Sequence, residues 1–264
     1  MPRVFLLAEW RNLIIVSYHV PPALLERYLP RGLEPDLFDG KPAVSLVAFE
    51  FRNTRVWGVP WPGFVNFPEL NLRFYVKTRE ASPRRGVVFV REFVPSRFVS
   101  KMARGLYNEP YASAPMDFRV RSIPAAEGLM RSEGMRSEER EPGSVSSPLI
   151  TSPLISAACT VTFNHAKHTL AATASPALHT PHDSTTEHLL KEHQWGYGQT
   201  RDGRTLMYEV VHPTWRIHER MSVRVDVDWA RLYGTEWGVM QDAVPFSAIL
   251  AEGSGVTVST ASVL

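Results

Sequence analysis

Apolar residues recur along the chain with two spacings, one typical of strands and one typical of helices. The strand segments have an apolar residue at every second position, or are apolar throughout, and are rich in Val, Ile, Leu and aromatic residues. We predict strands within residues 3–20, 33–51, 67–78, 84–95, 155–175, 196–213, 220–229 and 253–260. Several of these segments contain a turn, so the pattern predicts about ten strands in all.

Four short segments are predicted to be helices, namely 21–30, 96–108, 184–196 and 228–240. Ser96 is the expected N-cap of the second of these helices. Ser184 is the expected N-cap of the third, where Glu187 completes a capping-box pattern. The helices are short compared with the strands, so the chain is predicted to be mainly β.

The turn signals indicate how the strands connect. Asp39-Gly40 and Asp202-Gly203 each separate two apolar runs, which predicts β-hairpins. Residues 53–68 are rich in proline, glycine and tryptophan and predict a packed loop. Short local connections favour an antiparallel fold that closes into a barrel or cone, rather than βαβ units.

Residues 122–153 differ from the rest of the chain. They show no periodicity, are dense in Ser, Pro, Glu and Arg, and contain the short repeat MRSEGMRSE. This composition predicts a mobile insertion within a single domain that spans residues 1–264. The segment is either an insertion without a role or a surface for a partner.

The composition excludes several classes of function. The chain has 264 residues, with 29 basic and 27 acidic residues, and no long basic block, so we expect no nucleic-acid partner. No apolar run is long enough for a membrane span, and the N-terminus is a poor signal peptide, so we expect a cytoplasmic protein without a membrane partner. The single cysteine, Cys159, fits a reducing compartment. Whether the chain forms a homo-oligomer stays open.

No familiar catalytic or nucleotide-binding motif is present in the sequence. Two readings exist for the nine histidines, of which His179, His182, His188 and His193 form the densest group. They could ligate a metal, or they could be ordinary surface or hydrogen-bonded residues, and their spacing favours the second. We therefore expect no metal site and no cofactor. Cys159 is expected to be a buried, inert thiol.

Charged residues interrupt the most apolar strand of the chain at AEWRN, residues 8–12. Simple alternation places Arg11 on the face that also carries Glu9, Leu13 and Ile15. In segment 67–78, alternation separates Leu70, Leu72, Phe74 and Val76 from a polar face with Glu69, Asn71, Arg73 and Tyr75. If both polar faces point into one barrel, a guanidinium there favours a carboxylate ligand. A structural ion pair or plain solvent exposure are the alternatives.

Several ordered motifs resemble a known family. They include AEWRNLIIVSYHVPPALLERYLP, NFPELNLRFYVKT, GVVFVREFVPS, ARGLYNEPYASAPM and QWGYGQTRDGRTLMYEVVHPTW. Together they resemble the YqjF-like proteins, an uncharacterised bacterial group also called the domain-of-unknown-function family DUF2071. The resemblance covers nearly the whole chain except residues 122–153, and it implies no known activity.

The YqjF-like proteins in turn resemble acetoacetate decarboxylase more distantly. That resemblance implies a cone-shaped antiparallel β-barrel with a covering sheet. It places Arg11 at the position of an active-site arginine and Glu69 near an active-site glutamate. Pro110 matches the proline of the lysine-bearing segment, but Tyr111 stands where the Schiff-base lysine is expected. Lys101, on the preceding helix, is a poor replacement, so the resemblance implies that Schiff-base decarboxylation is lost.

Three functions are consistent with these features. The first is a lysine-independent enzyme that acts on a small carbonyl or carboxylate compound, with Glu69 and Tyr111 as catalytic residues. Its substrate-binding residues are expected to be Arg11, Arg73 and Asn108. The second is a non-catalytic binder or sensor of a small ligand in the same cavity. The third, weaker, is a partner-binding protein that uses the loop with Trp57 and Trp61 and the 122–153 insertion.

Overall fold

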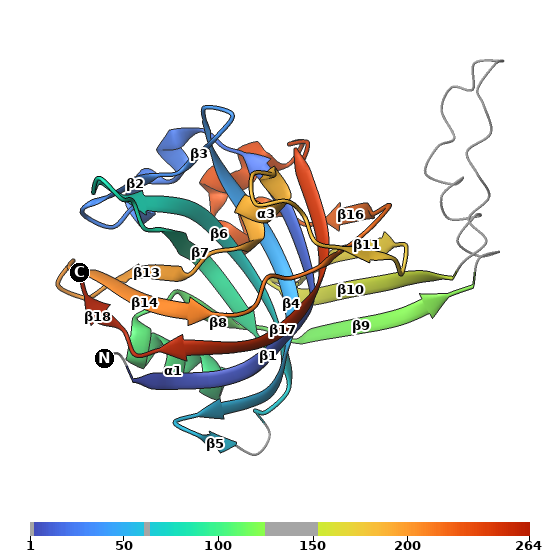
Figure 1. Cartoon of the computed structure of the whole chain (residues 1–264), viewed down its shortest axis with the longest axis horizontal. Helices are drawn as coiled ribbons and strands as arrows, with labels where there is room; N and C mark the ends of the chain where they lie inside the picture. The colour runs from blue at the N-terminus through green and yellow to red at the C-terminus, as the bar shows by residue number, and fades with distance from the viewer. Residues whose placement is uncertain (1–2, 61–63, 125–152) are drawn as a thin grey trace.

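A ring of long strands forms the body of the computed structural model, which describes residues 3–60, 64–124 and 153–264 (Figure 1). The ring follows the order β17–β1–β4–β6–β7–β13–β14 and closes where β14 pairs antiparallel with β17. These strands are β1 (Val4–His19), β4 (Lys41–Val56), β6 (Phe67–Thr78), β7 (Arg85–Val94), β13 (Trp195–Gln199), β14 (Thr205–Val211) and β17 (Ser247–Ser259). Closure satisfies the strand edges and encloses an interior. The prediction of a mainly β barrel is confirmed.

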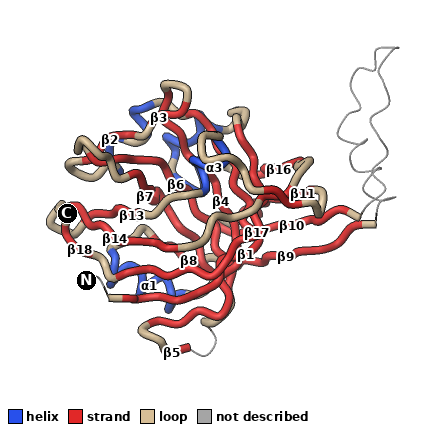
Figure 2. Tube along the Cα trace, viewed as in Figure 1, coloured by secondary structure: helices blue, strands red, loops and turns tan. Residues whose placement is uncertain are grey.

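Shorter strands extend the ring or attach to its members. They are β2 (Leu33–Pro35), β3 (Leu37–Phe38), β5 (Val59–Pro60), β8 (Tyr111–Ser113), β12 (Leu178–His179), β15 (Ile217–His218) and β18 (Ser262–Val263). A second, antiparallel sheet has the order β16–β11–β10–β9 and extends away from the ring in Figure 2. Its strands are β9 (Met116–Ile123), β10 (Leu154–Phe163), β11 (Ala166–Ala174) and β16 (Ser222–Asp226).

The helices are short, as the sequence predicts. They are α1 (Arg97–Tyr107), α3 (Thr186–Lys191) and α4 (Trp229–Tyr233), with the 3₁₀ turns η1 (Pro22–Leu24), η2 (Glu26–Tyr28) and η3 (Thr235–Met240). Ser96 caps α1 through hydrogen bonds to its side chain, as expected. The N-cap of α3 is Thr185, one residue after the predicted Ser184, so the expected capping box with Glu187 is wrong. None of the described helices is long and apolar enough to cross a membrane.

Two other local predictions need correction. The predicted loop 53–68 contains the end of β4 and the short strand β5, so part of it is hairpin. Helix α1 joins β7 to β8, and β8 pairs parallel with β7, so one small βαβ unit does occur. The predicted mobile insertion, residues 122–153, lies largely outside the described residues, which end at 124 after β9 and begin again at 153.

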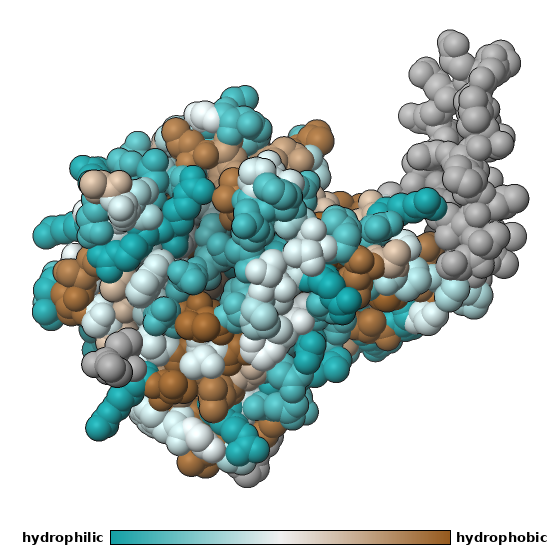
Figure 3. All heavy atoms as spheres, in the orientation of Figure 1, coloured by the Kyte–Doolittle hydropathy of each residue, from teal (hydrophilic) through white to brown (hydrophobic). Residues whose placement is uncertain are grey.

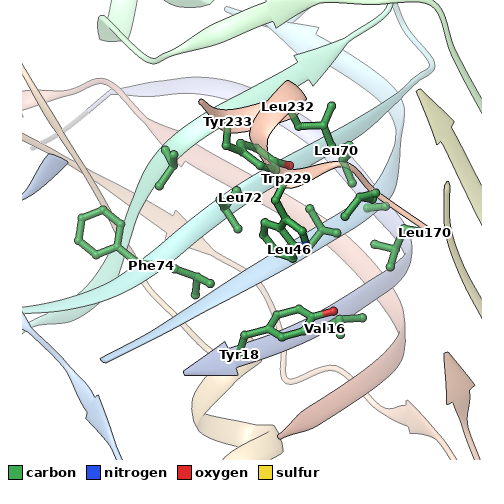
Figure 4. Close-up of a cluster of buried hydrophobic side chains, with 14 of the residues drawn as sticks. Val16, Tyr18, Leu46, Leu70, Leu72, Phe74, Leu170, Trp229, Leu232 and Tyr233 are labelled. Atoms are coloured by element: carbon green, nitrogen blue, oxygen red, sulfur yellow. The ribbon is translucent and has the colours of Figure 1, made fainter. Parts of the chain in front are cut away.

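The alternation predicted for β6 separates two environments. Its apolar face packs with the second sheet and α4 into a buried cluster, shown in Figure 4. Labelled members of that cluster are Val16, Tyr18, Leu46, Leu70, Leu72, Phe74, Leu170, Trp229, Leu232 and Tyr233. The opposite face of β6 carries the buried polar residues Glu69, Asn71 and Arg73. Because the outer face is covered by apolar packing, the polar face points into the ring.

A β-bulge in β1 explains the charged AEWRN stretch. Asn12 has a φ of 56°, and the register of β1 against β4 shifts between Arg11 and Ile14. The bulge reverses the alternation, so that Ala8 and Leu13 belong to the same interior cluster although they are an odd number of residues apart. Arg11 is thereby placed on the opposite face, and the expectation that it shares a face with Leu13 is corrected.

Candidate functional site

The interior of the ring contains a cavity of about 190 Å³. Strands β1, β4, β6 and β7 supply much of its wall, and α1 and the residues that follow α3 complete it. Most of the wall is apolar and aromatic, including Trp10, Phe49, Phe51, Phe89 and Trp215. In the view of Figure 3, apolar side chains gather in the middle of the larger lobe and are surrounded by polar ones. An apolar cavity with a few polar groups is the usual form of a small-molecule site.

Glu69 is the central acidic group of this cavity. It is 2% exposed, and its two carboxylate oxygens each accept one hydrogen bond. Asn71 Nδ2 donates to Oε1 at 2.9 Å, and the Tyr111 hydroxyl donates to Oε2 at 3.0 Å. Burial raises the pKa of Glu69 to about 7, even though both hydrogen bonds act to lower it. Near neutral pH, Glu69 can therefore both hold and release a proton.

Two further glutamates lie beside Glu69. Glu92 and Glu109 are buried and hydrogen-bond to each other, and the Tyr208 hydroxyl donates to Glu109 Oε1 at 2.8 Å. Burial, together with the charges of Glu109 and Glu69, raises the pKa of Glu92 well above its ordinary value. Burial also raises the pKa of Glu109, so both carboxyl groups favour the protonated form more than an exposed glutamate does. The negative charge of Glu109 also contributes to the raised pKa of Glu69.

Tyr111 links the acidic groups. Strand β8 pairs parallel with β7, with Tyr111 opposite Glu92, and the Tyr111 hydroxyl reaches Glu69 on β6. Burial and then the charge of Glu69 raise the pKa of Tyr111 well above its ordinary value. The hydroxyl stays protonated and acts as a hydrogen-bond donor.

Arg73 and His193 provide the positive and neutral polar groups of the cavity. Arg73 is 8% exposed, and its Nη2 donates to the Leu190 carbonyl at 3.0 Å. His193 packs its ring against Tyr75, with 4.9 Å between ring centroids. Burial, followed by the charge of Arg73, lowers the pKa of His193 well below its ordinary value. The imidazole is therefore neutral at pH 7, and Arg73 carries the positive charge.

Lys191 is a buried lysine that no motif in the sequence predicts as a site residue. Its side chain is fully buried, lines the cavity and forms an ion pair with Glu192. Glu192 Oε1 also accepts a hydrogen bond from the Trp215 backbone at 3.1 Å. The His212 ring stacks on Trp215 with 4.0 Å between centroids. The Nζ atom of Lys191 is thus bound to a carboxylate rather than free to attack a substrate.

The structure brings three of the five predicted site residues together. Glu69, Arg73 and Tyr111 all line the cavity. Arg11 lies outside it, with a side chain that is 37% exposed and paired to Glu9 Oε2 at 2.7 Å, so the shared interior position expected for Arg11 and Glu69 is corrected. Asn108 also lies outside the cavity, because it ends α1 in a left-handed conformation and is exposed. Its Nδ2 donates to the Gln199 carbonyl at 2.6 Å.

A second bulge accounts for the missed Glu92. Val87 and Phe89 line the cavity, so strict alternation places Glu92 on the outer face of β7. The register of β7 against β6 shifts between Phe89 and Arg91, and this returns Glu92 to the interior. The local sequence carries no glycine or asparagine that signals this bulge. Glu109 lies just after α1, Lys191 is the last residue of α3, and His193 follows it. The positions of these three residues in the cavity depend on contacts with residues distant in sequence.

No group of three or more His, Cys, Asp or Glu residues in the described part of the chain is arranged to hold a metal ion.

Burial raises the pKa of Cys159 to about 12, because this residue packs in the apolar cluster between the ring and the second sheet. The thiol therefore stays protonated at neutral pH.

Comparison with known sequences assigns the family. The family model for the DUF2071 proteins, described as an uncharacterized conserved protein, matches residues 7–254. The chain belongs to the DUF2071 family. Among curated DUF2071 relatives, the uncharacterized protein YqjF of Bacillus subtilis (strain 168) is 32% identical over 108 residues. That match covers 40% of this chain and 43% of YqjF, so the chain aligns with less than half of that relative.

Several solved structures have a fold similar to that of this DUF2071 chain over nearly its whole length. Acetoacetate decarboxylase from Legionella pneumophila has a TM-score of 0.62 and 14% identity, over 100% of this chain and 88% of that one. The enduracididine biosynthesis enzyme MppR complexed with pyruvate has a TM-score of 0.60 and 13% identity, and the match covers 100% of this chain and 91% of MppR. These likenesses show an acetoacetate-decarboxylase-like fold. Identity this low supports a shared fold but not a shared activity.

Proposed function

We propose that this chain is a lysine-independent enzyme that transfers a proton on a small carbonyl or carboxylate compound held in the barrel cavity. The observation that carries the proposal is Glu69, a buried carboxyl group with a pKa of about 7 on the wall of the cavity. A general acid or base is most effective when its pKa lies near the working pH. The fold likeness to MppR complexed with pyruvate adds support for a small carbonyl compound.

Each polar residue of the cavity has a role in such a reaction. The ionised Glu69 takes a proton from the carbon next to the substrate carbonyl, and the electron pair of that C–H bond moves toward the carbonyl oxygen. Tyr111 donates a hydrogen bond to the negative oxygen that forms. Glu69 then returns the proton to carbon. Arg73 holds the substrate by its negatively charged end.

Imine formation fits the site less well than proton transfer. The residue at the expected lysine position is Tyr111, and the lysine in the cavity, Lys191, is ion-paired with Glu192. Schiff-base chemistry requires a free amine, and the Nζ atom of Lys191 is held by the Glu192 carboxylate. The proposal therefore excludes a Schiff-base decarboxylase.

Incubation with a bacterial metabolite extract in ²H₂O tests the proposed function. The wild-type protein is expected to consume at least one compound or to introduce deuterium into it, as measured by mass spectrometry. Glu69→Gln is expected to slow that change at least about 100-fold, because the amide cannot accept the proton. The control Glu80→Gln removes an exposed carboxylate, 56% exposed and outside the cavity, and is expected to match the wild type.

Two outcomes contradict the proposed enzyme. If compounds are retained by the wild-type protein but none is consumed or labelled, the chain is the alternative, a small-ligand binder. If borohydride added with acetoacetate traps a covalent adduct on Lys191, a Schiff base forms and the lysine-independent route is wrong.

A further inference from the structure

Arg73 is a buried cation without an anionic partner in the part of the chain that the structure describes. Its Nε has no hydrogen-bond partner, and its single hydrogen bond runs from Nη2 to the neutral Leu190 carbonyl. The charge of Arg73 acts on Glu69, lowering its pKa, but the two side chains form no ion pair. The guanidinium of a buried arginine normally has a carboxylate or phosphate beside it, because an unpaired buried charge is costly.

The neighbouring polar groups leave this position open for an anion. His193 is neutral at pH 7, and neither of its ring nitrogens has a partner among the described residues. The positive charge of Lys191 is already matched by Glu192. Arg73 thus has one positive charge to offer, which fits a singly charged group better than a doubly charged one.

The acidic end of the cavity limits the rest of the ligand. Glu69, Glu92 and Glu109 are buried together, and burial, followed by repulsion from the charges of Glu109 and Glu69, raises the pKa of Glu92. A second anionic group on the ligand would add to that repulsion. The end of the ligand that faces the glutamates is therefore uncharged.

The apolar part of the cavity wall limits the body of the ligand. Its aromatic side chains include Trp10, Phe49, Phe51 and Trp215, and Trp10 lies at 5.3 Å from Phe49 and 6.1 Å from Trp215 between ring centroids. A volume of about 190 Å³ somewhat exceeds the roughly 150 Å³ of an engineered apolar cavity that binds benzene. The space therefore suits about one six-membered ring with a short chain.

We infer that the cavity selects a monocarboxylate with an apolar, ring-sized body, whose anion pairs with Arg73 and whose uncharged end faces the glutamates. This inference rests on the proposed function, for which it names the substrate class. In this inference, Arg73 selects for the negative charge of the ligand. The aromatic wall of the cavity selects for its apolar, ring-sized body.

Isothermal titration calorimetry with three unreactive probes tests the inference on the wild-type protein. The probes are 3-phenylpropionate, its neutral amide 3-phenylpropanamide, and propionate, which lacks the ring. We expect 3-phenylpropionate to bind at least about tenfold more tightly than either of the other two, since each lacks one recognised feature. Equal binding of the acid and the amide, or of the acid and propionate, overturns the inference, as does an absence of binding by all three.

An arginine variant and a matched control distinguish loss of charge recognition by Arg73 from a general effect of removing an arginine. Arg73→Gln is expected to lose the preference for the acid over the amide while it still binds the amide. Arg52→Gln, which removes an exposed arginine paired with Glu50, is expected to keep the wild-type preference. If Arg73→Gln does not fold, the comparison of the three probes on the wild type still decides the question.

The binding test and the turnover test can fail independently. Binding of 3-phenylpropionate through Arg73 without any turnover of extract compounds supports the inference and rejects the enzyme. Turnover that depends on Glu69, combined with no preference for the aromatic acid, supports the enzyme and overturns the inference.

Discussion

Glu69→Gln is expected to become more stable relative to the wild type as the pH rises from 5 to 8. Burial raises the pKa of Glu69 in the folded protein from its ordinary 4.5 to about 7. Between these two pH values the folded wild type keeps a proton that the unfolded chain releases, so its free energy of unfolding falls as the pH rises. Glutamine does not titrate at this position. The difference between the two proteins should grow by roughly 2 to 3 kcal/mol, at 1.36 kcal/mol for each unit of pKa shift.

Urea unfolding at pH 5, 6, 7 and 8 measures this difference. Glu80→Gln, which removes an exposed carboxylate, is the control, and its free energy of unfolding should stay within about 0.5 kcal/mol of the wild type at each pH. A Glu69→Gln curve parallel to the wild-type curve across this range contradicts the raised pKa, because both proteins would then release the same number of protons on unfolding.

Gly253→Ala is expected to destabilise the fold by about 3 kcal/mol or more. Gly253 has a φ of 75° and lies in β17 opposite Arg11, at the bulge of β1. A Cβ atom there would lie 1.9 Å from the Trp10 carbonyl oxygen and 2.8 Å from Leu13 Cδ1. The backbone oxygen cannot move away without breaking the β1–β17 pairing, so the variant combines left-handed strain with a clash.

Gly255→Ala is the matched control for this variant. It lies two residues further along the same strand, and a Cβ atom there would meet nothing within 4 Å. Its stability should stay within about 1 kcal/mol of the wild type, since a strand interior tolerates alanine better than glycine. Urea or thermal unfolding compares the two variants. Equal stability of Gly253→Ala and Gly255→Ala would show that the bulge does not require glycine.

Local patterns in the sequence predict most of the fold. Alternation in 67–78 correctly separates the apolar face of β6 from its polar face, because β6 keeps its own side-chain period throughout. The hairpin turns at Asp39-Gly40 and Asp202-Gly203 are confirmed, with positive φ values at Asp39, Gly40 and Gly203. Ser96 is confirmed as a helix cap. Each of these features depends on residues that are close together in the chain.

The candidate site is predicted less completely because bulges and distant contacts arrange it. Alternation through Asn12 places Arg11 inside the barrel, whereas the bulge turns it outward. Alternation through β7 places Glu92 outside, whereas a second bulge turns it inward. Asn12 is a type of residue that tolerates positive φ and is the one local signal of the first bulge. Lys191 enters the cavity through the packing of α3, which no pattern near it in the sequence predicts.

The ionisation of the Glu69 carboxyl group is the decisive property for a proton-transfer role of this residue. Infrared difference spectra of the wild type against Glu69→Gln, recorded from pH 4 to 9, isolate the C=O band of this one protonated carboxyl. We expect the band to disappear with a midpoint near pH 7, as for a buried acid that exchanges its proton at neutral pH. A midpoint near the ordinary 4.5 would contradict the proposed role of Glu69, because the carboxyl group would then be fully ionised at neutral pH.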